Sequence, residues 1–414
     1  PAEWPSGVAP PRRRQVWEAV VAGRCNIVVG ARSALFLPFV GLRLIVVDEE
    51  HETAFKQEDG VVYHARDMAV VRGKQAGALV VLGSATPSLE TLENTRRGRY
   101  RKLELKNRVD DRPMPTISLV DLRQERPREP LVQEEAPILS APLLDAMAET
   151  IAKGQQVILF LNRRGHSTFL ICEVCGNSVK CADCDVCLTY HRSQNRVVCH
   201  YCGVAHPLPD HCRECTGPLL KMGVGTERVE AEVAERIPQA RVARLDRDSA
   251  TSAERLTEML ASFARREIDV LVGTQMVAKG HDFPGVTLVC VVMADTSLAI
   301  PDFRAAERTF HLLTQVAGRA GRGKDPGRVL VQTYNPEADP VKRMLVHDFD
   351  GFAERELERR KVLAWPPYTR MAAVRLEGES AEQTASVARQ LGDFIARQMP
   401  PASWGVGSRW RPSR

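Results

Sequence analysis

Cysteines carry the clearest chemical signal in this sequence. The chain has 11 of them, and all but Cys25 and Cys290 fall between Cys172 and Cys215. Eight form four Cys-x-x-Cys pairs: Cys172/Cys175, Cys181/Cys184, Cys199/Cys202 and Cys212/Cys215. Two thiolates on one tight turn supply half of a tetrahedral site, so the four pairs predict two Zn²⁺ ions, each bound by four cysteines. Closed sites of this kind are structural, because no coordination position is left open.

The assignment of the pairs to sites has two solutions. The span from Cys184 to Cys199 suits one hairpin-like ribbon, so the two inner pairs can share one ion and the two outer pairs the other. A sequential arrangement, in which Cys172/Cys175 joins Cys181/Cys184, stays open. Cys187 is predicted to be an extra thiol, because eight ligands already fill two sites. The nearby histidines are interpreted as surface residues: His191, His200, His206 and His211.

A second signal is a run of acidic residues behind an apolar segment, where Asp48-Glu49-Glu50-His51 follows Leu42–Val47. One carboxylate there can hold Mg²⁺ through water, while its neighbour orients the water that attacks a phosphate. A solvated acidic turn is the alternative for Asp-Glu alone, and the full quartet favours catalysis. Ser84-Ala85-Thr86 follows the next apolar run, where two small hydroxyl residues can sense a Mg²⁺–phosphate site.

The third signal is a pair of arginines in the segment from Gln315 to Arg322. Arg319 and Arg322 are three residues apart, so on a helix they share one face. Small residues between them let that face approach another surface closely. Guanidinium groups suit the charge of a phosphoryl-transfer transition state, where one can contribute about 10³–10⁵ in rate. A solvated basic helix is the alternative.

The phosphate-binding loop that normally accompanies such residues is not found. It requires Gly-x-x-x-x-Gly-Lys followed by Ser or Thr, so that backbone N–H groups and the lysine hold the phosphates. Gly318, Gly323 and Lys324 have this spacing, but Asp325 stands at the hydroxyl position and would repel phosphate. We therefore expect that this chain alone does not hydrolyse ATP.

These residues need elements that place them at strand ends. Short apolar runs separated by helical stretches predict buried parallel sheets, in which ligands bind at the carboxyl ends of the strands. A first sheet is predicted from Asn26–Val29, Leu42–Val47 and Ala78–Leu82. A second is predicted from Val157–Leu161, Val242–Leu245, Ile268–Val272, Val286–Met293 and Val329–Val331.

We expect four regions along the chain. Residues 1–106 form a first lobe, and residues 107–140, rich in Pro, Arg and Glu, form a linker. Residues 141–345 form a second lobe, with the zinc-binding insertion at 170–217. Residues 346–414 form a partial C-terminal domain. Its stretch 350–363 is charged and predicted to be helical, up to the break at Trp365-Pro366-Pro367-Tyr368.

Composition restricts the class of protein. Hydrophobic residues make up 44% of the chain, and the net charge is +5. The first value is ordinary for a protein with sizeable cores, and the second permits nucleic-acid binding without establishing it. No run of about 18 apolar residues could span a membrane, and the start at Pro1 has no signal pattern. We expect a cytoplasmic, nucleoid-associated chain cut from a longer protein.

In this order, the signals resemble the motifs of superfamily 2 helicases. Asp48–His51 is similar to motif II, Ser84–Thr86 to motif III, Gly273–Phe283 to motif V and Gln315–Arg322 to motif VI. The resemblance implies an α/β fold with two RecA-like lobes, the first incomplete, and ATP with Mg²⁺ between them. It also implies a phosphate-binding loop upstream of Asp48, on a strand before residue 1, and a partial C-terminal α+β domain.

Longer stretches resemble one family of these helicases, the bacterial primosomal replication-restart helicases (PriA). They are Ser33–Phe39, Tyr63–Asp67, Gly83–Ser88, Asn162–Gly165, Ala278–Phe283 and Pro301–Arg308, together with the eight-cysteine insertion. The resemblance implies the nested arrangement of the two zinc sites. Ala31 departs from the family, which usually has Thr there, so one phosphate contact is expected to be missing. The end of the chain, Ala402–Arg409, also departs from it.

The motifs assign roles to individual residues. Catalysis is expected from Asp48, Glu49, Arg319 and Arg322, and coupling to ATP from His51, Ser84, Thr86 and Gln315. The DNA backbone is expected to contact Arg32, Ser33, Thr274 and Lys279. Phe55 and Tyr63 resemble an aromatic loop that senses single-stranded DNA by stacking on bases. Core packing of these two rings is the alternative.

The resemblance implies an ATP-dependent 3′→5′ DNA helicase that acts at stalled replication forks and initiates primosome assembly. The implied partners are single-stranded and forked DNA, single-strand-binding protein and proteins that load the replicative helicase. The alternative is a non-catalytic DNA-binding primosome scaffold that recruits partners through its zinc knob. A degraded phosphate-binding loop upstream of Pro1 would favour the scaffold.

Overall fold

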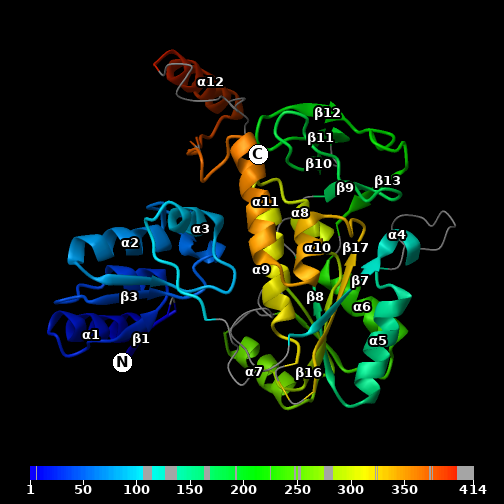
Figure 1. Cartoon of the computed structure of the whole chain (residues 1–414), viewed down its shortest axis with the longest axis horizontal. Helices are drawn as coiled ribbons and strands as arrows, with labels where there is room; N and C mark the ends of the chain where they lie inside the picture. Colours follow the sequence, from blue (N-terminus) through cyan, green and yellow to red (C-terminus); the bar gives the residue numbers. More distant parts are fainter. Residues whose placement is uncertain are drawn as a thin grey trace. The chain divides into compact units, whose positions relative to one another are not determined.

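The chain divides into two compact units, Pro1–Leu103 and Glu104–Arg414, which we call the first and the second unit. The computed structural model describes residues 1–5, 7–105, 114–125, 138–162, 168–191, 194–223, 225–246, 249, 253–274, 283–321, 323, 325–372, 374 and 376–398. Figure 1 shows the helices and strands of each unit. Among the described residues, no helix has both the length and the apolar character needed to cross a membrane.

The first unit alternates short strands with helices. In chain order its elements are β1 (Ala2–Trp4), α1 (Pro10–Val21), β2 (Val28–Gly30), η1 (Arg32–Phe36), β3 (Leu44–Val47), η2 (Thr53–Phe55), β4 (Lys56–Gln57), β5 (Tyr63–His64), α2 (Ala65–Ala76), β6 (Leu79–Leu82) and α3 (Leu89–Arg96). All three predicted strands are present, as β2, β3 and β6. Strand β3 pairs with β6 in parallel, whereas β2 pairs in parallel with β1, a strand that was not expected.

The parallel pair β3–β6 is covered on one face only, among the described residues. Helix α2 packs on that face so closely that a Cβ at Gly73 would lie 2.2 Å from Val80 Cγ2. Side chains alternate across a strand, and those of the other face are solvent-exposed: Leu44, Val46, Leu79 and Val81. The expectation of a sheet buried on both faces is therefore wrong for this pair.

The second unit is built on a six-stranded sheet in the order β14-β15-β8-β16-β17-β7, with every pair parallel. Its strands are β7 (Thr116–Asp121), β8 (Gln156–Phe160), β14 (Val242–Leu245), β15 (Val270–Gly273), β16 (Val286–Val291) and β17 (Arg328–Thr333). All five predicted strands are present. The sixth, β7, comes from the segment expected to be a linker. It is an edge strand, paired only with β17, and its weak alternation of polar and apolar residues was missed.

Helices cover both faces of this sheet (Figure 1). The helices of the second unit are α4 (Leu122–Glu125), α5 (Ala141–Ala152), α6 (Thr226–Arg236), α7 (Ala253–Ala264), α8 (Asp295–Leu298), α9 (Ala305–Ala317), α10 (Asp339–Leu345), α11 (Phe349–Val362) and α12 (Ala381–Gln398). Strand β8 illustrates why the sheet needs two cores. Val157 and Leu159 pack with α5 and α6, whereas Ile158 and Phe160 pack with α7, α9 and α11. Such burial on both faces explains the continuous apolar runs of the sequence.

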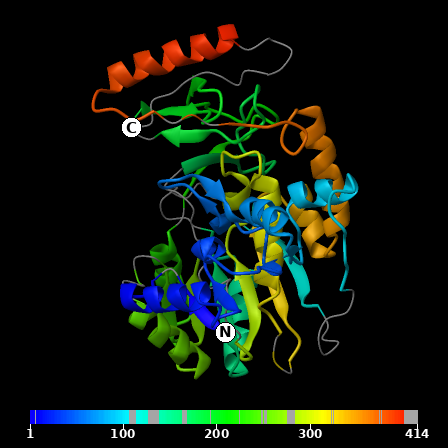
Figure 2. The same cartoon turned by 90° about the vertical axis from the view of Figure 1, so that its left-hand side faces the viewer.

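A smaller antiparallel sheet is inserted after β8. It has the order β12-β11-β10-β9-β13, from β9 (Thr168–Cys172), β10 (Thr189–His191), β11 (Arg196–Val198), β12 (Ala205–Pro207) and β13 (Leu219–Met222). In both views these strands gather beyond one end of the parallel sheet (Figures 1 and 2). Strand β13 pairs with β9 along its length, so the inserted module extends to Met222, beyond the expected boundary at 217.

Helix α11 belongs to the core of the second unit. Phe352 is buried and stacks on Phe310 of α9, with ring centroids 4.6 Å apart. Residues 349–362 were expected to begin a separate C-terminal domain, and their apolar packing onto α9 corrects that boundary. In the described part of 346–398 there are helices but no strand, so the α+β character expected for this region does not appear there.

A buried charged group joins α9 to α11. Arg360 is fully buried, and its guanidinium donates to Glu307 Oε2 at 2.8 Å and to Glu356 Oε1 at 3.0 Å. Burial raises the pKa of Glu356, and the positive charge of Arg360 opposes that effect. Breaking a buried ion group by removing one partner is strongly destabilising, because the remaining charge keeps its desolvation penalty.

We therefore expect Arg360→Met to lower the free energy of unfolding of the second unit by about 3–5 kcal/mol. Arg355→Met is the matched control, because Arg355 lies on the same helix in an exposed pair with Asp339. Its effect should stay within about 1 kcal/mol. Denaturant unfolding measures both variants, and equal losses would contradict a special role of the buried group.

Candidate nucleotide site and zinc ribbon

The first unit places its acidic and hydroxyl residues at one sheet edge. Asp48 directly follows β3, and Gly83 and Ser84 directly follow β6. Because β3 and β6 are parallel, with Val47 opposite Leu82, both turns leave the same edge. Cross-links hold them together: Gly83 N–H donates to Val47 O at 2.8 Å, and Glu50 N–H donates to Gly83 O at 3.0 Å.

Side chains join the same two turns. His51 Nδ1 lies 2.7 Å from Ser84 Oγ, and the same hydroxyl accepts a hydrogen bond from Thr86 N–H at 3.0 Å. The Glu49 carboxylate is half-exposed, with Oε2 at 3.6 Å from His51 Nδ1. The structure thus brings together Asp48 and four of the residues expected to act with it: Glu49, His51, Ser84 and Thr86. Their roles with ATP stay predictions.

Sequence reasoning gave no separate role to Glu50. The structure buries its carboxylate with 1% exposed, next to Arg66 and Ser88. No local pattern distinguishes Glu50 from its acidic neighbours. The only available signal was the expectation that a deeply buried charge has a partner, and this partner lies 16 residues away.

The predicted DNA-contacting residues of the first unit lie around η1 and the β4–β5 hairpin. Arg32 Nη1 donates to Lys56 O at 2.5 Å, and Tyr63 packs edge-on against Phe36, with centroids 5.2 Å apart. Phe36 is 51% exposed. The sequence analysis gave it no role, although it lies in the stretch Ser33–Phe39 that carries the family resemblance. Ser33 Oγ accepts from Trp4 Nε1 at 3.0 Å, and Phe55 is half-buried. Contacts with DNA stay predictions for all of them.

In the second unit, the expected arginine helix is shorter than predicted. Gln315 lies on α9, but that helix ends at Ala317 and Arg319 lies in the following turn, with its N–H donating to Val316 O at 3.0 Å. Gly321 has φ +69°, a left-handed conformation that glycine adopts readily. Arg319 therefore lies beyond the end of α9, so the expectation that it occupies a helical face is wrong. Arg322 lies outside the described residues.

Thr274 and Lys279 were expected to contact the DNA backbone. Thr274 follows β15 at the carboxyl edge of the large sheet, where its N–H lies 3.4 Å from Leu245 O. Lys279 lies outside the described residues, as does the whole stretch 275–282.

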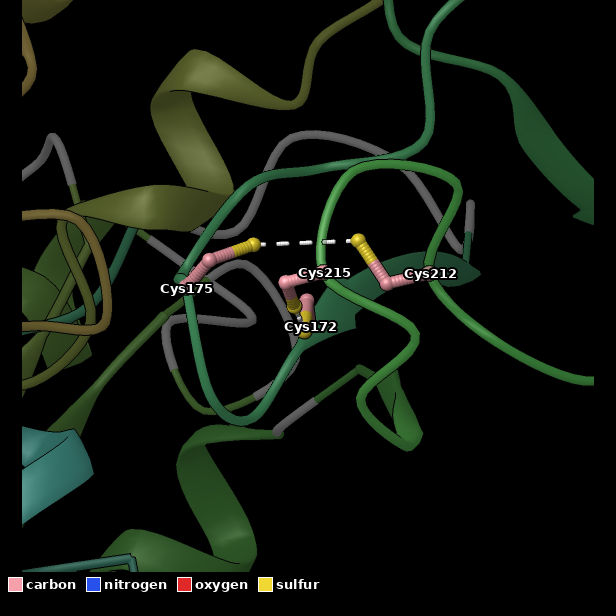
Figure 3. A group of neighbouring side chains, drawn as sticks. All are labelled: Cys172, Cys175, Cys212 and Cys215. Carbon is pink, nitrogen blue, oxygen red and sulfur yellow. Dashed lines mark hydrogen bonds between the residues drawn. The ribbon is translucent and has the colours of Figure 1, made fainter.

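The eight paired cysteines form two clusters in the nested arrangement. One contains Cys172, Cys175, Cys212 and Cys215, and the other contains Cys181, Cys184, Cys199 and Cys202. Within each cluster the sulfur atoms lie within 4.8 Å of one another. Figure 3 shows the outer cluster, where Cys175 Sγ lies 3.7 Å from Cys212 Sγ and Cys172 Sγ lies 3.4 Å from Cys215 Sγ.

These distances fit zinc. Four sulfurs at about 2.3 Å from a tetrahedral Zn²⁺ are about 3.8 Å from one another. The inner cluster has the same spacing, with Cys181 Sγ at 3.6 Å from Cys202 Sγ. Burial raises the pKa of the Cys175 thiol to about 12, so bound metal must displace a proton there. The chain therefore contains two four-cysteine zinc-binding sites.

One backbone turn is repeated at all four cysteine pairs. The residue after the second cysteine has a positive φ each time, namely Gly176 (+72°), Asp185 (+48°), Gly203 (+87°) and Thr216 (+59°). Its N–H donates to the carbonyl of the first cysteine at 2.9–3.1 Å. This turn presents both sulfurs on one side. Backbone donors also reach sulfur, as from Tyr201 N–H to Cys199 Sγ at 3.4 Å.

Cys187 and the nearby histidines lie outside both clusters, as expected for Cys187. Burial raises the pKa of Cys187 to about 11, and its side chain belongs to the main core of the second unit. His191 and His200 stack on each other with centroids 5.6 Å apart. The stacked pair is a feature that the cysteine spacing could not indicate.

Each zinc site has its own contacts with the rest of the second unit. At the outer site, Gly176 packs so closely that a Cβ there would lie 1.9 Å from Tyr334 O. Tyr334 N–H in turn donates to buried Asp295 at 2.9 Å. At the inner site, Tyr201 Oη donates to Asp302 Oδ1 at 3.3 Å and accepts from Phe303 N–H at 3.1 Å. The ribbon is therefore a docked part of the second unit.

Acidic and hydroxyl residues lie at the ends of parallel strands in the first unit, and a double four-cysteine ribbon is inserted in the parallel α/β sheet of the second unit. These features together are those of a helicase-type fold. Two family models match the second unit: "Helicase conserved C-terminal domain" over residues 222–324 and "PriA DNA helicase Cys-rich region (CRR) domain" over residues 181–207.

Curated relatives extend the match to nearly the whole chain. Replication restart protein PriA of Bacillus subtilis is 44% identical over 94% of this chain and 48% of its own length. The Synechocystis protein of the same name is 40% identical over 96% and 49%, and that of Rickettsia felis is 38% identical over 94% and 60%. The chain belongs to the PriA family of replication restart proteins and spans about half to three-fifths of the length of these relatives.

Zinc content tests the nested arrangement directly. The double variant Cys172→Ser/Cys212→Ser should retain one Zn²⁺ per chain, because both changes fall in the same site. A sequential arrangement would place the two changes in different sites and remove both ions. Cys187→Ser is the control and should retain two. Metal analysis of the purified variants gives the answer.

Proposed function

We propose that this chain is the motor part of an ATP-dependent DNA helicase that moves 3′→5′ on DNA and acts at stalled replication forks. On this proposal the intact protein also initiates primosome assembly for replication restart, in the cytoplasm at the nucleoid. The proposal is supported above all by the shared edge of β3 and β6. There Asp48 and Glu49 lie beside Ser84, linked through His51.

Roles follow from the chemistry of these side chains. Asp48 supplies an acidic oxygen that can hold Mg²⁺ through water, and half-exposed Glu49 can orient the attacking water. His51, bonded to Ser84, and Thr86 beside it would couple the state of the nucleotide to the rest of the motor. Gln315 would take part in the same coupling from α9. Arg319 and Arg322 would supply positive charge to the transferring phosphoryl group.

DNA binding is proposed for both units. Arg32 and Ser33 would contact the backbone of a single strand from η1, and Thr274 and Lys279 would do so from the second unit. Phe55 and Tyr63 would stack on bases, where one aromatic contact contributes about 1–3 kcal/mol. Single-stranded and forked DNA are the proposed nucleic-acid partners.

The zinc ribbon has a different role in this proposal. Both of its sites are closed by four cysteines and cannot bind a substrate. We propose that it is a rigid knob that supports unwinding. It would also contact protein partners, which are single-strand-binding protein and the proteins that load the replicative helicase.

The catalytic part of the proposal is tested in the intact protein. Glu49→Gln should lower DNA-stimulated ATP turnover by about 10²-fold or more, because an amide cannot act as the base that orients water. Arg322→Ala should also abolish it. Glu52→Gln is the control on the same turn and should retain activity. The 414-residue chain alone, which has no phosphate-binding loop sequence, should show no turnover.

The outcomes separate the two functions considered from the sequence. ATP turnover that persists in both Glu49→Gln and Arg322→Ala would contradict the catalytic roles assigned to these two residues. An intact protein that binds forked DNA but never hydrolyses ATP would instead be the non-catalytic primosome scaffold.

A further inference from the structure

Glu49 has an unusual backbone conformation for its residue type. Its φ is +48°, in the left-handed region. For residues with a Cβ this region costs roughly 1–2 kcal/mol, and glycine is the residue that adopts it routinely. Such conformations persist only where the surrounding structure imposes them, and they cluster at functional sites. Something close to Glu49 must therefore hold it there.

The segment before Glu49 is held by the sheet. Val47 is the last residue of β3, opposite Leu82, and its carbonyl accepts from Gly83 N–H. The Asp48 carboxylate then accepts from the N–H of Glu49 itself, at 2.9 Å. The chain thus enters residue 49 from a fixed position.

The residue on the other side, Glu50, is held even more firmly. Its N–H donates to Gly83 O at 3.0 Å. Its buried carboxylate accepts from Ser88 N–H at 2.7 Å, from the hydroxyls of Ser88 and Thr91 at 3.0 Å each, and from Arg66 Nη1 at 3.2 Å. The backbone of Glu50 is therefore tied to the end of β6, and its side chain is tied to the start of α3.

Arg66 completes the anchor. Its Nη1 also donates to Ser88 Oγ at 2.6 Å, and its Nε donates to Asp67 at 2.9 Å. Burial of the guanidinium favours its neutral form, but the carboxylates of Asp67 and Glu50 outweigh burial and raise the pKa of Arg66. The Glu50 carboxylate is thus a charge-compensated, fully bonded group, the arrangement in which a buried charge rigidifies its surroundings.

We propose that Glu50 is a positioning residue for Glu49. Anchored by Arg66 and by the start of α3, Glu50 forces the intervening peptide into the left-handed turn that leaves the Glu49 carboxylate facing out beside His51. The chemical meaning of this orientation rests on the proposed function, in which Glu49 orients water. The conformational claim stands without it.

The test compares two substitutions at residue 49 in two backgrounds of the 414-residue chain. Glycine tolerates a positive φ and alanine does not, so the Gly-over-Ala advantage at this position measures the imposed strain. Hydrogen–deuterium exchange of the peptide covering residues 44–55 reports local opening. In the native background, Glu49→Gly should exchange about fivefold or more slowly than Glu49→Ala.

In the Glu50→Gln background this advantage should vanish or reverse. The amide cannot accept all four donors, so residue 49 relaxes, and alanine then stabilises by restricting the unfolded chain. Thr91→Val, which removes one donor only, should reduce the advantage in part and serves if Glu50→Gln does not fold. Glu93→Gln is the matched control, because Glu93 lies on α3 but pairs with Arg97 and not with Glu50 or Arg66, and it should leave the advantage unchanged.

Three results would overturn the proposal. They are the absence of a Gly-over-Ala advantage in the native background, its full retention in the Glu50→Gln background, and its equal loss in Glu93→Gln. A failure of the proposed function would look different. Glu49→Gln would then leave the ATP turnover of the intact protein unchanged, while the hydrogen–deuterium exchange results stayed as expected.

Discussion

Parallel pairing is the constraint on which both units depend. When strands run in the same direction, the turns that follow them all leave the same edge of the sheet, however far apart they lie in the sequence. Between β3 and β6 this rule brings an acidic turn to a hydroxyl turn, 33 residues apart at His51 and Ser84. In the large sheet it places Thr274 after β15 and buried Asp295 after β16 at one edge. The chemistry of the chain is thus located by strand direction.

The zinc ribbon follows a different principle. Its strands are only three to five residues long, too short to bury a core large enough for independent stability. Two metal sites replace part of that core, and the inner cysteines pack with Tyr190, Val197 and Phe303 in a small apolar cluster. Because Phe303 lies just before α9, this cluster joins the inner zinc site to a helix that packs on the large sheet of the second unit. The insertion is therefore anchored next to α9 by this cluster.

Much of this could be predicted from the sequence, for identifiable physical reasons. Continuous apolar runs such as Val286–Met293 are typical of strands buried on both faces, and cysteine pairs separated by two intervening residues leave few alternatives to metal. Strand β7 was not predicted because it lies at the edge of the sheet. Its side chains are mostly exposed or only partly buried, so its sequence has no continuous apolar run. The segment from Gln315 to Arg322 was treated as helical because it forms one motif. In the structure α9 ends at Ala317, and Gly321 has a positive φ. The anchor at Glu50 was invisible, since its partner Arg66 is distant in the sequence and nothing local marks the pair.

The uncovered face of the β3–β6 pair has a practical consequence for anyone who handles this polypeptide. Leu44, Val46, Leu79 and Val81 present a flat aliphatic surface to water, with 42–67% of each residue accessible. Contiguous surfaces of this kind attract other apolar surfaces and favour aggregation. The attraction strengthens on warming and in sulfate salts, so the isolated polypeptide should aggregate more readily under those conditions. A low temperature and the avoidance of sulfate salts during purification should therefore keep more of it in solution.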